Sequence, residues 1–133
     1  MKNHFLRRIC LLLAISMSLI FCGCTNETNK SETKTNDREY QMSELIGEYT
    51  FSMDRNGTTY DYKLVITGNN GKATRESYTW ESQRQGITWK DDLYSGTVSL
   101  TRESIEIGGR QGYIETIDGV ITITIQDIAY RKK

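Results

Sequence analysis

Residues 49–66 read YTFSMDRNGTTYDYKLVI, and this stretch decides the fold class. Large apolar side chains alternate with small or polar ones on both sides of Asn56-Gly57, from Tyr49 to Met53 and again from Tyr60 to Ile66. A period of two is typical of a β-strand with one buried face. Asn-Gly tolerates the positive φ angles of a tight turn. The stretch therefore predicts an antiparallel hairpin.

The same signals continue toward the C-terminus. Isoleucine and threonine alternate over 121–125, and Asn70-Gly71 and Asp118-Gly119 predict two more tight turns. The alternation changes phase at Gln126-Asp127, where we expect a bulge in the last strand. Less regular strand candidates, which bring the expected total to about eight, lie at 74–80, 86–90, 94–100, 103–107 and 112–117.

These elements predict an all-β domain. About eight short consecutive strands favour a small antiparallel up-and-down barrel, because closure leaves no open sheet edge. The uncharged, strongly β-forming segment 120–126 needs that protection. A two-sheet β-sandwich is the alternative. The single helical candidate is a short turn over 41–45, with Ser43 as its expected cap.

The N-terminus has the pattern of a secretory signal. Three basic residues precede an apolar run from Ile9 to Phe21, which at 13 residues is too short to span a bilayer of about 30 Å. The run ends in Phe21-Cys22-Gly23-Cys24, which resembles the lipobox of bacterial lipoproteins. This resemblance implies a signal peptide over 1–23, lipid attachment at Cys24, and a membrane-anchored location in the bacterial cell envelope, outside the cytoplasm.

Removal of residues 1–23 changes the available chemistry. The remaining chain has no histidine and a single cysteine, Cys24, which the lipid would occupy. A Cys/His metal site and a histidine-based catalytic triad therefore cannot be assembled. Fourteen basic residues then face 17 acidic ones, which disfavours nucleic-acid binding. We expect a protein that is not an enzyme and that uses neither a cofactor nor a metal.

The rest of the chain divides into a tether and a domain. Residues 24–41 are polar and of mixed charge, which predicts a flexible tether after the lipidated cysteine. In the domain, 42–133, Leu45-Ile46-Gly47-Glu48-Tyr49, the Trp80 region and the closing segment 128–132 resemble the pattern of small lipocalin-like lipoproteins. The resemblance implies an up-and-down barrel whose open end holds a ligand.

Aromatic residues are the best candidates for a binding site. Trp80 and Trp89 share an inward parity with Tyr78 and Ile87, and tyrosines add phenols to the same interior. The composition favours rings that simply fill a small core without disulfides, and the alternative is that they line a pocket for a flat or apolar ligand. The tentative ligand-binding residues are Tyr49, Tyr62, Trp80 and Trp89.

Other motifs carry weaker signals. Glu81, Asp91 and Asp92 are the best placed for two-carboxylate hydrolysis, but the sequence favours a solvated turn as their explanation. Gly108 to Gly112 lacks the order of a phosphate-binding loop and predicts a connection between strands.

Two functions follow from these features. The first is an anchored envelope lipoprotein whose barrel binds a small apolar ligand or an envelope protein without catalysis. The alternative is a proteinaceous inhibitor of an extracellular or cell-wall hydrolase.

Overall fold

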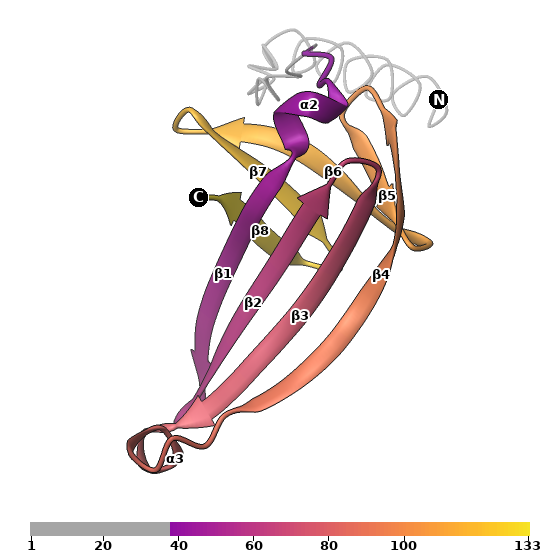
Figure 1. Ribbon diagram of the computed structural model, residues 1–133. Coiled ribbons are helices and arrows are strands. Elements are labelled where there is room, and N and C mark those ends of the chain that lie inside the picture. The colour runs from indigo at the N-terminus through magenta and orange to yellow at the C-terminus, as the bar shows by residue number, and fades with distance from the viewer. Residues whose placement is uncertain (1–37) are drawn as a thin grey trace, which may run out of the picture. The chain divides into compact units, whose positions relative to one another are not determined.

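A closed antiparallel barrel accounts for nearly all of residues 38–133, the part of the chain that the computed structural model describes (Figure 1). Each strand pairs with the next, and β8 returns to β1. The up-and-down order confirms the predicted barrel and not the sandwich. The predicted signal peptide, Cys24 and most of the tether lie outside the described residues. In chain order the strands are β1 (Gly47–Arg55), β2 (Thr58–Thr67), β3 (Asn70–Thr79), β4 (Trp89–Thr101), β5 (Ser104–Ile107), β6 (Arg110–Ile117), β7 (Val120–Ile125) and β8 (Ile128–Lys132).

Two of the three predicted turns are confirmed. Asn56-Gly57 joins β1 to β2 with φ angles of 53° and 76°, and Asp118-Gly119 joins β6 to β7 with 53° and 77°. The third prediction is wrong, because Gly68-Asn69 turns the chain and Asn70-Gly71 begins β3. Gly71 serves packing instead: a Cβ atom there would lie 2.8 Å from Cγ2 of Ile107.

The structure has the expected eight strands, but one predicted strand is absent and one strand was not predicted. Residues 86–90 do not form a separate strand, because helix α3 (Trp80–Arg84) and a loop precede β4. Gln126-Asp127 is not a bulge but a tight turn, with φ angles of 52° and 64°, so β8 is a strand of its own. The helix starts at a reciprocal cap, in which Ser82 N donates to Thr79 Oγ1 and Thr79 N donates to Ser82 Oγ.

The folded domain begins earlier than the predicted boundary at Met42. Tyr40 is 2% exposed, and its hydroxyl lies 3.0 Å from Thr116 Oγ1. The predicted tether is therefore wrong at its C-terminal end, because this ring packs in the core. The short helical turn is confirmed as α2 (Met42–Leu45), but Gln41 rather than Ser43 is its N-cap.

The core fills the half of the barrel next to α2. Tyr49 is fully buried, and its hydroxyl donates to the carbonyl of Leu45 at 2.8 Å. Tyr94 and Tyr130 are joined by a hydroxyl–hydroxyl hydrogen bond of 3.3 Å. Burial raises the pKa of all three phenols above the ordinary value. Other core residues include Leu64, Ile66, Ala73, Val98, Ile105, Ile107, Ile114, Ile123 and Ile125.

The eight strands differ in length, and this opens the other half of the barrel. β1 pairs with β8 at Tyr49 and Thr50, whereas β4 pairs with β5 only over 98–101. Beyond these contacts β1 to β4 continue together as a four-stranded sheet toward α3, and β5 to β8 stop short of it (Figure 1). We call this sheet the extension; it consists of residues 51–55, 58–62, 75–79 and 89–92.

Candidate binding face

The register brings two rows of side chains onto one face of the extension. Residues that face each other across paired strands share a face, and every second residue along a strand returns to it. The neighbouring row on this face, Tyr49, Leu64, Ala73 and Tyr94, belongs to the core. The two rows of the extension therefore continue the barrel interior. We call them the inner face: Phe51, Tyr62, Arg75 and Asp91, then Met53, Tyr60, Ser77 and Trp89.

Side-chain contacts agree with this register. The rings of Phe51 and Tyr62 lie 5.9 Å apart between centroids. The Arg75 guanidinium carbon lies 5.7 Å from the centroid of the Tyr60 ring, a cation–π distance. Its Nε and Nη2 atoms donate to Oδ2 of Asp91 at 3.2 and 2.5 Å, and this ion pair raises the pKa of Arg75. One ion pair therefore stands among aromatic rings.

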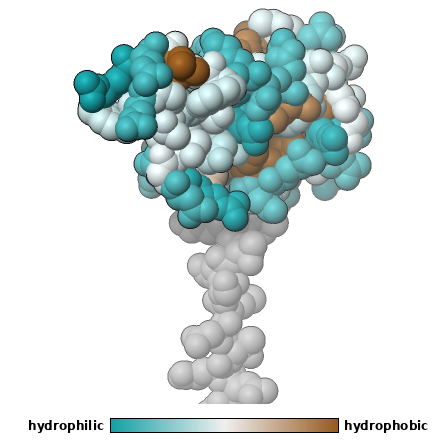
Figure 2. All heavy atoms as spheres, turned by 90° about the horizontal axis from the view of Figure 1, so that it is seen from below, coloured by the Kyte–Doolittle hydropathy of each residue, from teal (hydrophilic) through white to brown (hydrophobic). Residues whose placement is uncertain are grey.

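Solvent reaches this face. Trp89 is 55% exposed and Met53 is 36% exposed, whereas Leu64 of the adjoining core row is fully buried. Seen from below, hydrophobic residues, brown in Figure 2, are visible between hydrophilic ones, teal, on this side of the domain. The same sheet face thus changes from a packed core to an accessible surface along the length of β1 to β4.

The structure brings together two of the four predicted ligand-binding residues. Tyr62 and Trp89 lie on the inner face. Tyr49 is enclosed in the core, with no exposed surface, so it is not part of the accessible inner face. The inward prediction is wrong for Trp80, which is 71% exposed at the start of α3.

The inward parity also fails around Trp80. Tyr78 lies on the opposite face of β3, where its hydroxyl donates to Oδ2 of Asp61 at 3.0 Å. Ile87 is 44% exposed in the loop after α3. The physical reason is that α3 interrupts the strand period between β3 and β4, so the alternation cannot be continued from one strand into the next.

Sequence reasoning missed the Arg75–Asp91 pair. The position of Arg75 follows from alternation with Ala73 and Ser77 on a predicted strand. Asp91 could not be placed in this way, because a bulge lies opposite Ala73 and Thr74. The bulge brings Tyr94 and Asp91, three residues apart, to the same side of β4.

The carboxylates singled out for catalysis are separated. Asp91 is on the inner face, while Asp92 points to the outer face and binds Nζ of Lys72 at 3.0 Å. Glu81 is exposed on α3. Within residues 38–133 no group of three Asp, Glu, His or Cys side chains could hold a metal ion. Gly108-Gly109 forms the predicted connection, a tight turn between β5 and β6.

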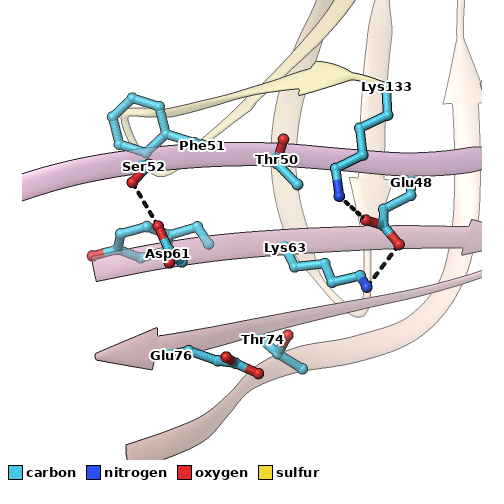
Figure 3. A pocket seen from close by; sticks show the side chains of 10 residues that line it. Glu48, Thr50, Phe51, Ser52, Asp61, Lys63, Thr74, Glu76 and Lys133 are labelled. Atoms are coloured by element: carbon cyan, nitrogen blue, oxygen red, sulfur yellow. Dashed lines mark hydrogen bonds and ion pairs between the residues drawn. The ribbon is translucent and has the colours of Figure 1, made fainter. Parts of the chain in front are cut away.

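A second candidate is a shallow hollow on the outer face of β1 to β3, with a volume of about 460 Å³ (Figure 3). Glu48 contacts Nζ of Lys63 at 2.7 Å and also pairs with Lys133, and these two bonds lower the pKa of Glu48. Ser52 donates to Asp61 at 2.5 Å. Because these polar groups bond one another, the hollow is a solvated polar surface and the inner face is the better site.

The fold and the site define a class: a small up-and-down β-barrel that is packed at one end and open along an aromatic sheet face at the other. Neither helix within residues 38–133 is long and apolar enough to cross a membrane. No family model matches the chain, and comparisons with curated proteins and with solved structures found no significant match.

Proposed function

We propose that this protein is a lipid-anchored lipoprotein of the bacterial cell envelope, and that its barrel binds a ligand without catalysing a reaction. The observation that carries the binding role is the accessible inner face, where the exposed ring of Trp89 and the half-buried rings of Phe51, Tyr60 and Tyr62 share one sheet face with an ion pair. Exposed rings with a few convergent polar groups are typical of ligand sites.

The position of this face fits an anchored protein. Residue 38 and α2 lie at the packed end of the barrel, and the extension leads to α3 at the opposite end (Figure 1). A chain that enters the domain at the packed end can be attached there without the use of any residue of the inner face.

The anchor is tested by metabolic labelling of cells with a fatty-acid probe. Cys24→Ala is expected to lose the label, whereas the matched control Cys22→Ala keeps it. Label that persists in Cys24→Ala contradicts the assignment. The binding role is tested by a ligand screen that compares the unchanged protein with Trp89→Ala. If every ligand binds both proteins with the same affinity, the proposed binding role is wrong.

Helix α3 and the loop that follows it support a second function, inhibition of an extracellular or cell-wall hydrolase. Trp80 and Ile87 are 71% and 44% exposed around α3, at the end of the extension, as expected for a protruding contact with a protein partner. Lysozymes and other cell-wall hydrolases are the first targets to assay. Unchanged lysis rates in the presence of excess protein remove this function.

A further inference from the structure

The inner face combines two chemistries that restrict its ligand. Trp89 offers an exposed ring beside the half-buried rings of Tyr60 and Tyr62, while Arg75 on β3 and Asp91 on β4 offer polar atoms between them. The two bonds between Arg75 and Asp91 use two of the five guanidinium N–H groups. The side chains of Arg75 and Asp91 are 35% and 48% exposed, so a ligand on the rings also meets this pair.

A wholly apolar ligand does not fit this face. It would cover Arg75 and Asp91 without giving them hydrogen bonds, and covering charged groups in that way is unfavourable. A strongly charged ligand fits no better. An anion would compete with Asp91 for the guanidinium, and a cation would compete with Arg75 for the carboxylate. The ion pair is already neutral as a unit, so the face attracts neither sign of charge.

A second copy of the chain or another folded protein is also a poor occupant. The inner face has eight residues, whereas a standard protein interface uses about 20–30 on each side. The two free strand edges that border it carry Asp54 and Arg55 on β1 and Lys90, Asp91 and Asp92 on β4. Charges at such positions disfavour pairing with another strand.

We infer that the inner face binds an uncharged glycan chain, an inference that rests on the binding role proposed above. A sugar ring has C–H groups on its flat side, which suit the negative face of an aromatic ring. Its hydroxyls both donate and accept, so they bond to the free guanidinium N–H groups and to the carboxylate oxygens without displacing the ion pair. The face spans four neighbouring strands, about 14 Å at about 4.8 Å per strand spacing, which suits a short extended chain that lies across them.

Titration calorimetry on the purified protein tests this inference with defined probes. Neutral oligomers of glucose and of N-acetylglucosamine are compared with an oligouronate, which is anionic, and with a fatty acid. We expect the protein to bind a neutral oligosaccharide and not the oligouronate or the fatty acid. Trp89→Ala is expected to weaken this binding about tenfold or more, because one stacking ring is lost.

Two further variants sharpen the test. Trp80→Ala is the matched control, since it removes a still more exposed indole outside the inner face, and its affinity should equal that of the unchanged protein. Arg75→Met keeps an unbranched apolar stem and removes the charge and the donors, so it should weaken binding about tenfold. Circular dichroism of each variant checks that the barrel is intact.

The outcomes separate the glycan from the binding role. If the protein binds a fatty acid or the oligouronate and Trp89→Ala weakens that binding, the inner face is a binding site but the glycan inference is wrong. If a neutral oligosaccharide binds with the same affinity in Trp89→Ala, the inner face is not its site and the inference is again wrong. If no probe binds in a Trp89-dependent way, both the inference and the binding role are overturned.

Discussion

Replacement of Leu64 by alanine measures the difference between the packed and the open parts of one sheet face. Leu64 is fully buried in the row between Tyr49 and Ala73. The change removes three carbon atoms, a transfer term of about 2.4 kcal/mol at about 0.8 kcal/mol per methylene. With the cavity left behind, the expected loss is about 3–5 kcal/mol, a large part of the 5–15 kcal/mol of a typical domain.

Met53→Ala is the matched change, because Met53 lies on the same face of β1 two rows away and is 36% exposed. We expect it to cost about 1 kcal/mol or less. Urea denaturation of the purified protein measures both values, with an unchanged slope as the sign that the unfolded state is unaffected. A loss of about 3 kcal/mol also lowers Tm by about 12–24 °C for a domain of this size. Equal losses at Leu64 and Met53 would refute the reasoning, because the inner face would then be covered in solution.

Three further predictions concern packing, pH and local structure. Gly71→Ala is expected to destabilise the barrel by about 1–3 kcal/mol, since its Cβ would meet Ile107 at 2.8 Å, and a denaturation curve that is unchanged would contradict this contact. Burial raises the pKa of the core phenols of Tyr49 and Tyr94, so their contribution to stability is complete below about pH 10 and is lost as the pH rises further; a fraction of the tyrosinate absorbance that appears only together with unfolding confirms it. Thr79→Ala removes the cap of α3 and should cost about 1 kcal/mol, with faster amide exchange in 80–84 but not in β7.

The sequence predicts the architecture well because each hairpin carries its own signals. Asn56-Gly57 and Asp118-Gly119 sit between alternating segments, so turn chemistry and strand period agree with the closed barrel. Gln126-Asp127 contains no glycine, so its sequence predicts a bulge where the structure forms a tight turn. Tyr40 was missed for a related reason: a single ring in a polar segment has no periodicity, and only the tertiary contact with Thr116 shows that it is buried.

The candidate site was harder to predict than the fold. Tyr62 and Trp89 are on the inner face as expected, but their exposure depends on where β5 to β8 end, which alternation within β1 to β4 cannot reveal. Tyr49 has the same parity as Phe51, yet it lies in the closed half and is buried. The Arg75–Asp91 pair needs the bulge in β4 as well as the register. The alternation of side chains along β1 to β4 predicts which residues face the barrel interior. The length of β5 to β8 determines which of those residues are covered, and the alternation does not predict it.

Acrylamide quenching of Trp89 fluorescence tests most directly whether the inner face is an open binding surface. A Trp80→Phe background leaves Trp89 as the only tryptophan of the chain. We predict strong quenching in the free protein, as for an indole that is half exposed, and clear protection at saturating neutral oligosaccharide. Weak quenching in the free protein, or quenching that saturating ligand leaves unchanged, would contradict the account.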